Sequence, residues 1–316
     1  MSRPDGSPTL PPETEAVLRR LEYVVRNKLD GLLQGSYLGL IPGPGTEPGE
    51  SRQYYPGDDV RRMDWPVTAR TMTPHVRQTV ADRELESWLV VDLSPSLDFG
   101  TVNLQKRDLV YAAATAVVHL TTKAGNRVGA IVTNGEASYR IPAVGGTNHA
   151  RYLLRKLAAT PRGGHGREHD LRDALEQVRR PPRRRGMVTV ISDFLGEPDW
   201  ERPLRGLGDR HELLGIEIVD PREMDLPAAG LVTFVDPESG EQLEVQTSDA
   251  QLRYRYATAA REQRANIATM LRRAGADHLQ LRTDRDWLAD VARFVVTRRR
   301  GVAVRPPSRA GMIGVH

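Results

Sequence analysis

The chain has 316 residues, of which 39% are hydrophobic and 27% charged, and its formal net charge is +4. This composition is that of an ordinary soluble protein, with length for one large core or two modest ones. The absence of cysteine excludes disulfides, thiolate zinc sites and cysteine nucleophiles. No apolar run approaches the roughly 20 residues of a membrane helix, and the N-terminus lacks the apolar core of a signal peptide, so we expect a cytoplasmic protein.

The N-terminal part begins with a Pro-rich stretch, residues 1–12, which we expect to be disordered. Residues 13–82 follow as an N-terminal extension. Apolar residues at helical spacing predict a helix over Glu13–Leu33, with a wide apolar face that needs a partner. The Gly- and Pro-rich stretch Gly35–Glu50 is not a phosphate loop, because it lacks the Gly-Lys-Ser/Thr ending and its prolines remove amide donors.

A segment dense in charges and aromatic side chains comes next, around the turn Pro56-Gly57. It is either a local ion-pair and packing cluster that holds the N-terminal part on the core, or a recognition surface. Its candidate binding residues are Arg52, Tyr54, Asp58, Asp59, Arg61, Asp64, Trp65 and Arg70.

Residues 83–300 alternate short apolar strands with amphipathic helices. This alternation predicts an α/β domain with a right-handed, doubly wound, mostly parallel sheet and helices on both faces. Two short β-type runs predict an inserted β-hairpin at about 225–247. Residues 301–316 form a basic tail that we expect to be flexible.

Two of the predicted strands end in a carboxylate. The apolar run Trp88–Val91 is followed by Asp92, Ser94 and Ser96 at alternate positions, and Met187–Ser192 is followed by Asp193. Side chains at alternate positions of extended chain point the same way, and the carboxyl ends of parallel strands share one edge of the sheet. We therefore expect these oxygen groups to converge and to hold Mg²⁺ or Mn²⁺.

These residues resemble the metal-ion-dependent adhesion site of von Willebrand factor A domains, whose pattern is Asp-x-Ser-x-Ser, a distant Thr and a distant Asp. The resemblance implies that Asp92, Ser94, Ser96 and Asp193 are metal ligands. It leaves the Thr open: His169 stands where the Thr is expected, and Gly145-Gly146-Thr147 comes one helix earlier. Either Thr147 reaches the metal or the site is incomplete.

The pattern Arg-x-Tyr-x-Pro-Gly-Asp-Asp-x-Arg-x-x-Asp-Trp over residues 52–65 is similar to the signature of the family called domain of unknown function fifty-eight. Further matches are Gly125–Gly129, Ile191–Phe194, Asp220–Glu223 and Asp236–Gly240. The resemblance implies a von Willebrand A-like domain that works as an adaptor or regulator with a MoxR-type AAA+ ATPase. It also implies a metal-dependent latch that an acidic residue of a client protein completes.

Other activities fit the sequence less well. The arginine groups lack the interleaved aromatic residues of a nucleic-acid surface, so we expect no nucleic-acid partner. The enzyme alternative is an aspartyl phosphotransferase or hydrolase of the haloacid dehalogenase type, which also has an Asp after its first strand and holds Mg²⁺. That class needs a second Asp as acid/base at the position of Ser94, and a serine hydroxyl is a poor general acid. We therefore predict a non-enzymatic binding module.

Overall fold

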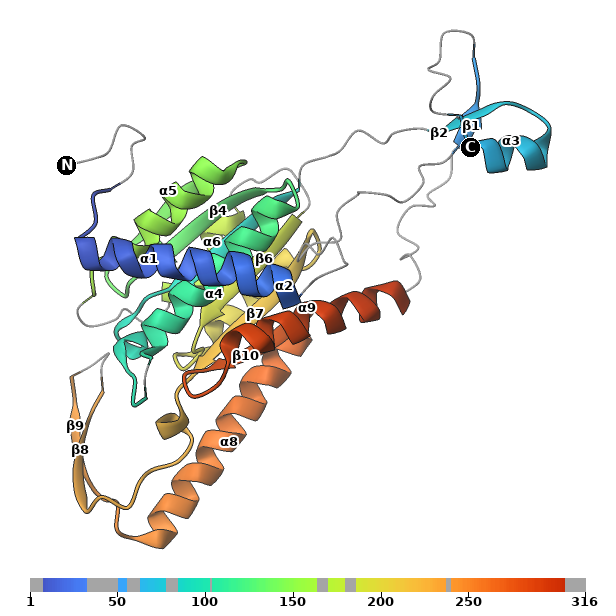
Figure 1. Ribbon diagram of the computed structural model, residues 1–316. Coiled ribbons are helices and arrows are strands. Elements are labelled where there is room, and N and C mark those ends of the chain that lie inside the picture. The colour runs from blue at the N-terminus through green and yellow to red at the C-terminus, as the bar shows by residue number, and fades with distance from the viewer. Residues whose placement is uncertain are drawn as a thin grey trace.

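A six-stranded sheet forms the centre of the molecule (Figure 1). The computed structural model describes residues 8–32, 51–55, 63–77, 85–102, 104–163, 170–179, 186–236 and 240–304. The strands of the sheet, in spatial order, are β10 (Ala276–Arg282), β7 (His211–Val219), β6 (Gly186–Ser192), β3 (Glu86–Asp92), β4 (Arg127–Thr133) and β5 (Ser138–Val144). All neighbours pair in parallel except β4 and β5, which are antiparallel.

The strand order confirms the predicted von Willebrand A-like, doubly wound α/β sheet. The chain enters at β3 near the middle, winds outward through β4 to β5, and then returns across β3 to add β6, β7 and β10. Such a reversal creates a crevice at the carboxyl ends of the strands on either side of it, here β3 and β6. The prediction of apolar strands covered on both faces holds for β3 and β6, whose residues from Ser87 to Asp92 and from Gly186 to Ser192 are all buried.

Helices cover both faces of the sheet. One face carries α4 (Lys106–Lys123), α5 (Thr147–Ala158) and α9 (Trp287–Val304), which share one hydrophobic core with Leu89 and Val91 of β3. The other face carries α6 (Asp170–Arg179), α7 (Glu201–Leu207) and α8 (Ala250–Arg273), which share a second core with Trp88 and Val90. Alternate residues of β3 therefore belong to two different cores, as the period of a strand requires.

The predicted N-terminal helix is present and finds its partner inside the chain. It consists of α1 (Pro12–Val24), a π-helical turn (Val25–Leu29) and α2 (Asp30–Leu32). Val25 and Leu29 are fully buried, and the turn that carries them contacts α4 and α9. Figure 1 shows this helix lying across the outside of α4.

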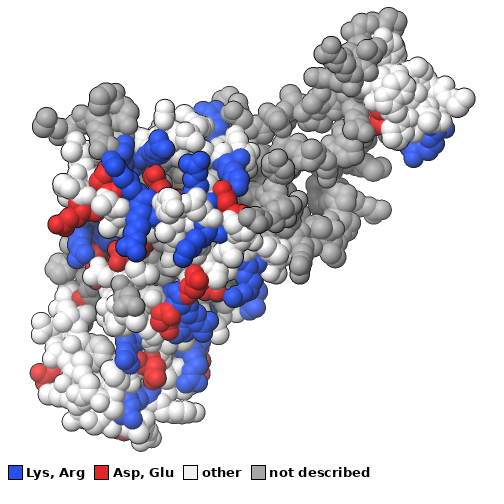
Figure 2. All heavy atoms as spheres, viewed as in Figure 1, with Lys and Arg blue, Asp and Glu red and all other residues white. Residues whose placement is uncertain are grey.

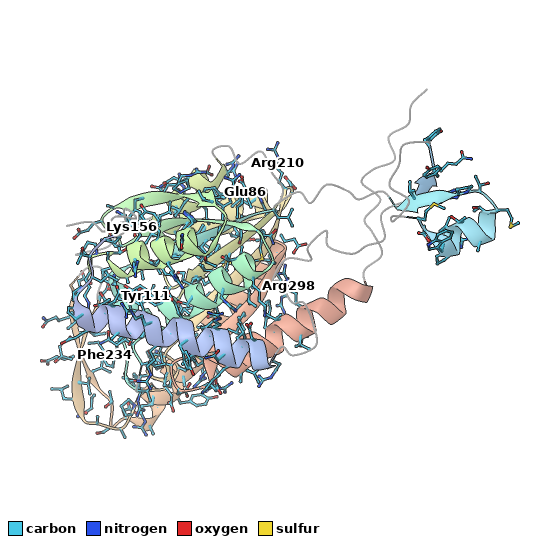
Figure 3. The ribbon with its side chains drawn as sticks, turned by 45° about the horizontal axis from the view of Figure 1, so that its top comes forward. Glu86, Tyr111, Lys156, Arg210, Phe234 and Arg298 are labelled. Carbon is cyan, nitrogen blue, oxygen red and sulfur yellow. The ribbon has the colours of Figure 1, made fainter. Side chains whose placement is uncertain are left out.

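The predicted hairpin is formed by β8 (Leu231–Val235) and β9 (Gln242–Gln246), which pair antiparallel. In Figure 1 the hairpin and the first half of α8 extend beyond the sheet. Figure 3 places Phe234 of the hairpin at the opposite end of the molecule from Glu86, the first residue of β3. The hairpin therefore projects on the side where the parallel strands end. It carries exposed apolar residues: Leu231, Phe234, Val235 and Leu243.

The charged and aromatic segment folds into a small unit of its own elements. β1 (Ser51–Gln53) pairs antiparallel with β2 (His75–Arg77), and α3 (Trp65–Thr71) lies between them in sequence. Asp64 is buried and caps α3 by accepting a hydrogen bond from the backbone N–H of Val67.

Charges of both signs share the surface. Figure 2 shows basic and acidic side chains interleaved over the face seen in Figure 1. Arg298, from the basic group near the end of α9, pairs with Glu212 at 2.8 Å and Asp277 at 2.6 Å. The basic group Arg183–Arg185 lies outside the described residues. Among the helices in the described ranges, none is both long and apolar enough to cross a membrane.

Candidate functional site

Asp92 ends β3 at the carboxyl edge of the sheet and is only 7% exposed. Its Oδ1 accepts a hydrogen bond from the backbone N–H of Ser94 at 2.9 Å, and its Oδ2 accepts one from the Ser192 hydroxyl at 2.7 Å. Ser192 ends the neighbouring strand β6, so this second bond joins the two strand ends across the sheet. Both oxygens of Asp92 are therefore held in fixed directions.

Ser94 and Ser96 stand beside this carboxylate. A short 3-10 turn, Pro95–Asp98, brings their hydroxyl oxygens to 3.2 Å from each other. Both side chains are half-buried, so they form the accessible rim above the buried acids. Ser96 also hydrogen-bonds the Asp193 carboxylate. The two serines thus link the ends of β3 and β6, although the segment is a 3-10 turn and not the extended chain on which the prediction from their alternate spacing rested.

Asp193 follows β6 and is 2% exposed. Its Oδ1 accepts a hydrogen bond from the backbone N–H of Leu195 at 3.2 Å, and its Oδ2 accepts one from the Lys106 ammonium at 2.6 Å. The next residue, Phe194, has a φ of 56°, a left-handed conformation that is uncommon for a large side chain. Such local strain often marks a functional loop, and it persists here because the Phe194 ring packs against Trp200.

Lys106 begins α4 and is fully buried. Its ammonium contacts Asp193 and Glu223. Glu223 in turn accepts a hydrogen bond from the Arg264 guanidinium of α8 at 2.9 Å. The same guanidinium also donates to Glu217 of β7 at 3.1 Å and to the backbone carbonyl of Asp193 at 2.9 Å. The acids of the edge are therefore connected to α4 and α8 by one buried ionic network.

The network continues to the last strand of the sheet. Glu217 is fully buried, and its Oε2 accepts a hydrogen bond from Gln280 at 3.1 Å and lies 2.8 Å from His278 Nε2. Over the described residues, the network joins four acidic side chains to two strongly basic ones. The acids are Asp92, Asp193, Glu217 and Glu223, and the bases are Lys106 and Arg264.

The two strand-end acids differ in their pKa values. Burial, together with the nearby charge of Asp193, raises the pKa of Asp92 above its ordinary value. Burial acts in the same direction on Asp193, but the charge and hydrogen bond of Lys106 outweigh it and lower the pKa of Asp193. Burial disfavours a charged Lys106, and the two carboxylates beside it overcome this effect and raise its pKa. The described residues therefore supply Asp193, but not Asp92, with a positive partner.

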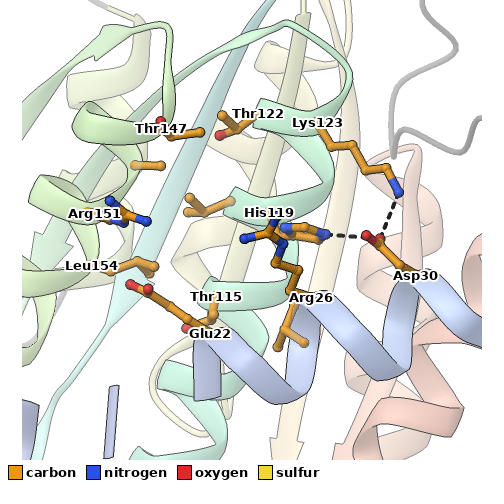
Figure 4. Close-up of a pocket in the computed structure, with 13 residues that line it drawn as sticks. Glu22, Arg26, Asp30, Thr115, His119, Thr122, Lys123, Thr147, Arg151 and Leu154 are labelled. Carbon is orange, nitrogen blue, oxygen red and sulfur yellow. Dashed lines mark hydrogen bonds and ion pairs between the residues drawn. The ribbon is translucent and has the colours of Figure 1, made fainter. Parts of the chain in front are cut away.

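Thr147 does not join this site. It begins α5 just after β5, and because β5 is antiparallel to β4, the end of β5 lies at the edge where the parallel strands begin. Figure 4 shows Thr147 in a different pocket, of about 390 Å³, between the N-terminal helix and α4, together with His119 and Lys123. The alternative in which Thr147 reaches the metal is therefore wrong. His169 lies outside the described residues.

The segment residues named as binding candidates do not gather at the edge as one set. Tyr54 is half-buried and Trp65 is 66% exposed, while Arg70 lies exposed on α3. Asp64 serves as a helix cap, and Arg52 lies in β1. The exposure of Trp65 disagrees with a packing cluster at that position. Asp58, Asp59 and Arg61 lie outside the described residues.

The chemistry of the edge fits one hard cation on its serine side. Two hydroxyl oxygens 3.2 Å apart and the Asp92 carboxylate without a positive partner are oxygen donors of the type that Mg²⁺ and Mn²⁺ prefer. Within the described ranges, no group of three acidic, histidine or cysteine residues could hold a metal by itself. A cation here would rely on the Asp92 carboxylate, on the hydroxyls and on oxygens from outside the described residues, such as water or a partner group.

Several residues of the network were not predicted as site residues. Lys106, Arg264 and Ser192 carry no signal of their own in the sequence. Glu217 does, because it interrupts an otherwise apolar strand, and a charge inside a buried strand needs a partner. Glu223 lies in the motif Asp220–Glu223, which resembled the family without suggesting a role.

The fold and this edge together define a von Willebrand A-like α/β protein with a polar site at the carboxyl ends of its central strands. The chain belongs to the family described as "Protein of unknown function DUF58", which matches residues 50–266. Two similar proteins are "Uncharacterized protein Rv1480" of Mycobacterium tuberculosis and "Uncharacterized protein Mb1516" of Mycobacterium bovis. Each is 56% identical over 290 residues, which cover 92% of this chain and 91% of the relative.

Two solved structures show distant similarity to this chain. One is the conserved hypothetical protein BatB from Bacteroides thetaiotaomicron, with a TM-score of 0.42, 14% identity, and coverage of 69% of this chain and 99% of that one. The other is the SpRpn10 VWA domain, with a TM-score of 0.38, 11% identity, and coverage of 68% and 95%. Similarity this distant says nothing about what the chain binds.

Proposed function

We propose that this protein is a non-enzymatic protein-binding module whose partner docks at the carboxyl edge of the sheet. The observation that supports this best is the convergence of Asp92, Ser94 and Ser96 with Asp193 at one rim. The acids lie below the rim and the hydroxyls at its surface, so a partner group can approach the hydroxyls without unfolding the edge. The exposed apolar residues of the nearby hairpin offer additional contact area.

The proposed contact is a metal-dependent latch. Mg²⁺ or Mn²⁺ would link this rim to an acidic side chain of the partner. On this chain, Ser94 and Ser96 would supply hydroxyl oxygens and Asp92 a carboxylate. Asp193 would orient Ser96 through the hydrogen bond between them.

We further propose that the partner is a MoxR-type AAA+ ATPase or a client that it processes. Support comes from membership of the DUF58 family. The resemblance to this family implied an adaptor or regulator that works with such an ATPase. An adaptor needs one surface for the ATPase and another for the client. Two candidate surfaces on this chain are the rim formed by Ser94 and Ser96 and the exposed Trp65 on α3.

The phosphotransferase alternative receives no support from the geometry. Ser94, at the position of the acid/base, hydrogen-bonds the Asp92 carboxylate and the Ser96 hydroxyl, and a serine hydroxyl is a poor general acid. An assay with generic phosphoesters tests the point: turnover that Asp92→Asn abolishes would establish the enzyme instead.

A capture experiment tests the latch. The tagged protein and its Asp92→Asn and Ser96→Ala variants are incubated with the MoxR-type ATPase of the same organism, in Mg²⁺ or in EDTA. We expect capture only by the unsubstituted protein in Mg²⁺. Asp277→Asn is the matched control, because it makes the same acid-to-amide change where the parallel strand β10 begins. Equal capture under all conditions would reject the latch.

A further inference from the structure

The buried ammonium of Lys106 is the least expected feature of this edge. Lysine is seldom fully buried, and a buried lysine that stays charged needs close acidic partners. Lys106 has two, Asp193 and Glu223, and its first helical turn follows directly from the loop that carries Ser94 and Ser96. A positive charge is therefore built into the site beside one of its two strand-end acids.

This charge changes what a metal ion could do here. A divalent cation bound to Oδ2 of Asp193 would lie next to an ammonium that is already 2.6 Å from that oxygen, and the two positive charges would repel each other strongly at low dielectric. The other oxygen of Asp193 accepts from the backbone of Leu195. Both oxygens of Asp92 are also hydrogen-bonded, but their donors are the Ser94 amide and the Ser192 hydroxyl, which carry no net charge. A cation beside Asp92 and the two serines therefore avoids the direct repulsion that it would meet beside Asp193.

We infer that Lys106 is the resident counter-ion of this edge, so that the fold needs no divalent cation and the rim binds one only weakly in the absence of a partner. The inference rests on the proposed function in that it concerns the same rim and the same ion. It adds a specific role: Lys106 takes the charge-neutralising part that a metal would otherwise have beside Asp193. The ion then contributes to partner binding and not to folding.

The test uses the full-length protein without any partner. Thermal unfolding of the unsubstituted protein is measured in EDTA and in excess MgCl₂, and Mg²⁺ binding is measured by calorimetry. We expect the same Tm in both buffers and weak or undetectable Mg²⁺ binding. A Tm that falls in EDTA, or tight Mg²⁺ binding, overturns the inference.

Lys106→Met removes the resident charge and leaves two acids without it. We expect a lower Tm in EDTA, recovery of Tm in Mg²⁺, and Mg²⁺ affinity higher by roughly tenfold or more, since the repelling ammonium is gone. A merely structural lysine would not give this gain of affinity. Lys123→Met is the control, because Lys123 lies on the same helix but pairs with Asp30 at the far end. Unchanged Mg²⁺ affinity in Lys106→Met contradicts the inference.

A double variant covers the case in which Lys106→Met does not fold. Lys106→Met with Asp193→Asn replaces the ion pair by neutral groups of similar size, and Glu223 keeps Arg264 as its partner. We expect this variant to fold without Mg²⁺; a double variant that folds only in Mg²⁺ contradicts the inference. Because no ATPase is present, these results stand apart from the capture experiment, and either proposal can fail alone.

Discussion

Asp220 shows how a single side chain sets the geometry next to the site. It is fully buried and accepts hydrogen bonds from the backbone and hydroxyl of Thr101, the hydroxyl of Thr283 and the backbone of Arg222. It also caps the 3-10 turn Pro221–Glu223, whose Glu223 receives Lys106. Although burial raises the pKa of this carboxyl, the hydrogen bonds outweigh burial and lower it below the ordinary value.

This lowered pKa predicts a pH-dependent loss of stability. We expect Asp220→Asn to destabilise the protein at pH 7 by roughly 1–3 kcal/mol, because an amide cannot accept all four bonds. A carboxyl with a lowered folded-state pKa stabilises fully above its unfolded pKa of about 4, and the benefit disappears as pH falls through the folded value. The Tm difference between the two proteins should therefore be greatest near neutrality and narrow in acid. A difference that grows on acidification would contradict this account.

At the scale of elements, the N-terminal helix is an integral part of the domain. Val25 and Leu29 stand four residues apart, on one side of its π-helical turn, and both are fully buried. The same turn leaves Asp30 beside His119 and Lys123 of α4, and burial opposes but does not cancel the lowering of its pKa by these two bases. The helix thus covers α4 with an apolar inner side and a charged end.

Two leucines of this helix provide a matched pair. Leu29→Ala should destabilise the protein by about 2–4 kcal/mol, because it opens a cavity where the N-terminal helix packs against α4 and α9. Leu32→Ala removes the same atoms from a side chain that is 55% exposed, so we expect little change. Denaturant midpoints of the two variants give the comparison. Equal, small effects would mean that the helix is not docked in solution.

At the scale of the whole molecule, the two cores share one sheet. Leu109 of α4 belongs to the core on one face and Leu175 of α6 to the core on the other, and both are fully buried. β3 and β6 lie between them and contribute side chains to both. Neither face can lose its packing without exposing the strands that support the other.

We therefore expect the domain to unfold as one unit. Leu109→Ala and Leu175→Ala should each lower its stability by roughly 2–5 kcal/mol. Trp88 and Trp200 of the second face contribute to the fluorescence signal. Each variant should shift the unfolding transitions measured by circular dichroism and by tryptophan fluorescence to the same extent. A Leu109→Ala variant whose fluorescence transition stays in place while its circular dichroism shifts would show that the faces unfold separately.

The sequence by itself determined the secondary structure and the sheet edge. Apolar periodicity is local, so the helix predicted over Glu13–Leu33 and the hairpin predicted at about 225–247 are both found where the sequence placed them. The meeting of Asp92 with Asp193 also followed from local pattern, because parallel strands bring their carboxyl ends to one edge.

Only the tertiary structure decided which charged side chains pair at the site and that the Thr147 hydroxyl lies outside it. Lys106 lies 87 positions from Asp193 and 117 from Glu223, and no spacing rule connects them. Thr147 has the expected tripeptide, but the antiparallel direction of β5 puts it at the wrong edge. The hydrophobic pattern determines helices and strands because it acts between residues that are close in the chain. Buried ion pairs depend on how distant elements pack against each other, and the local sequence does not determine that packing.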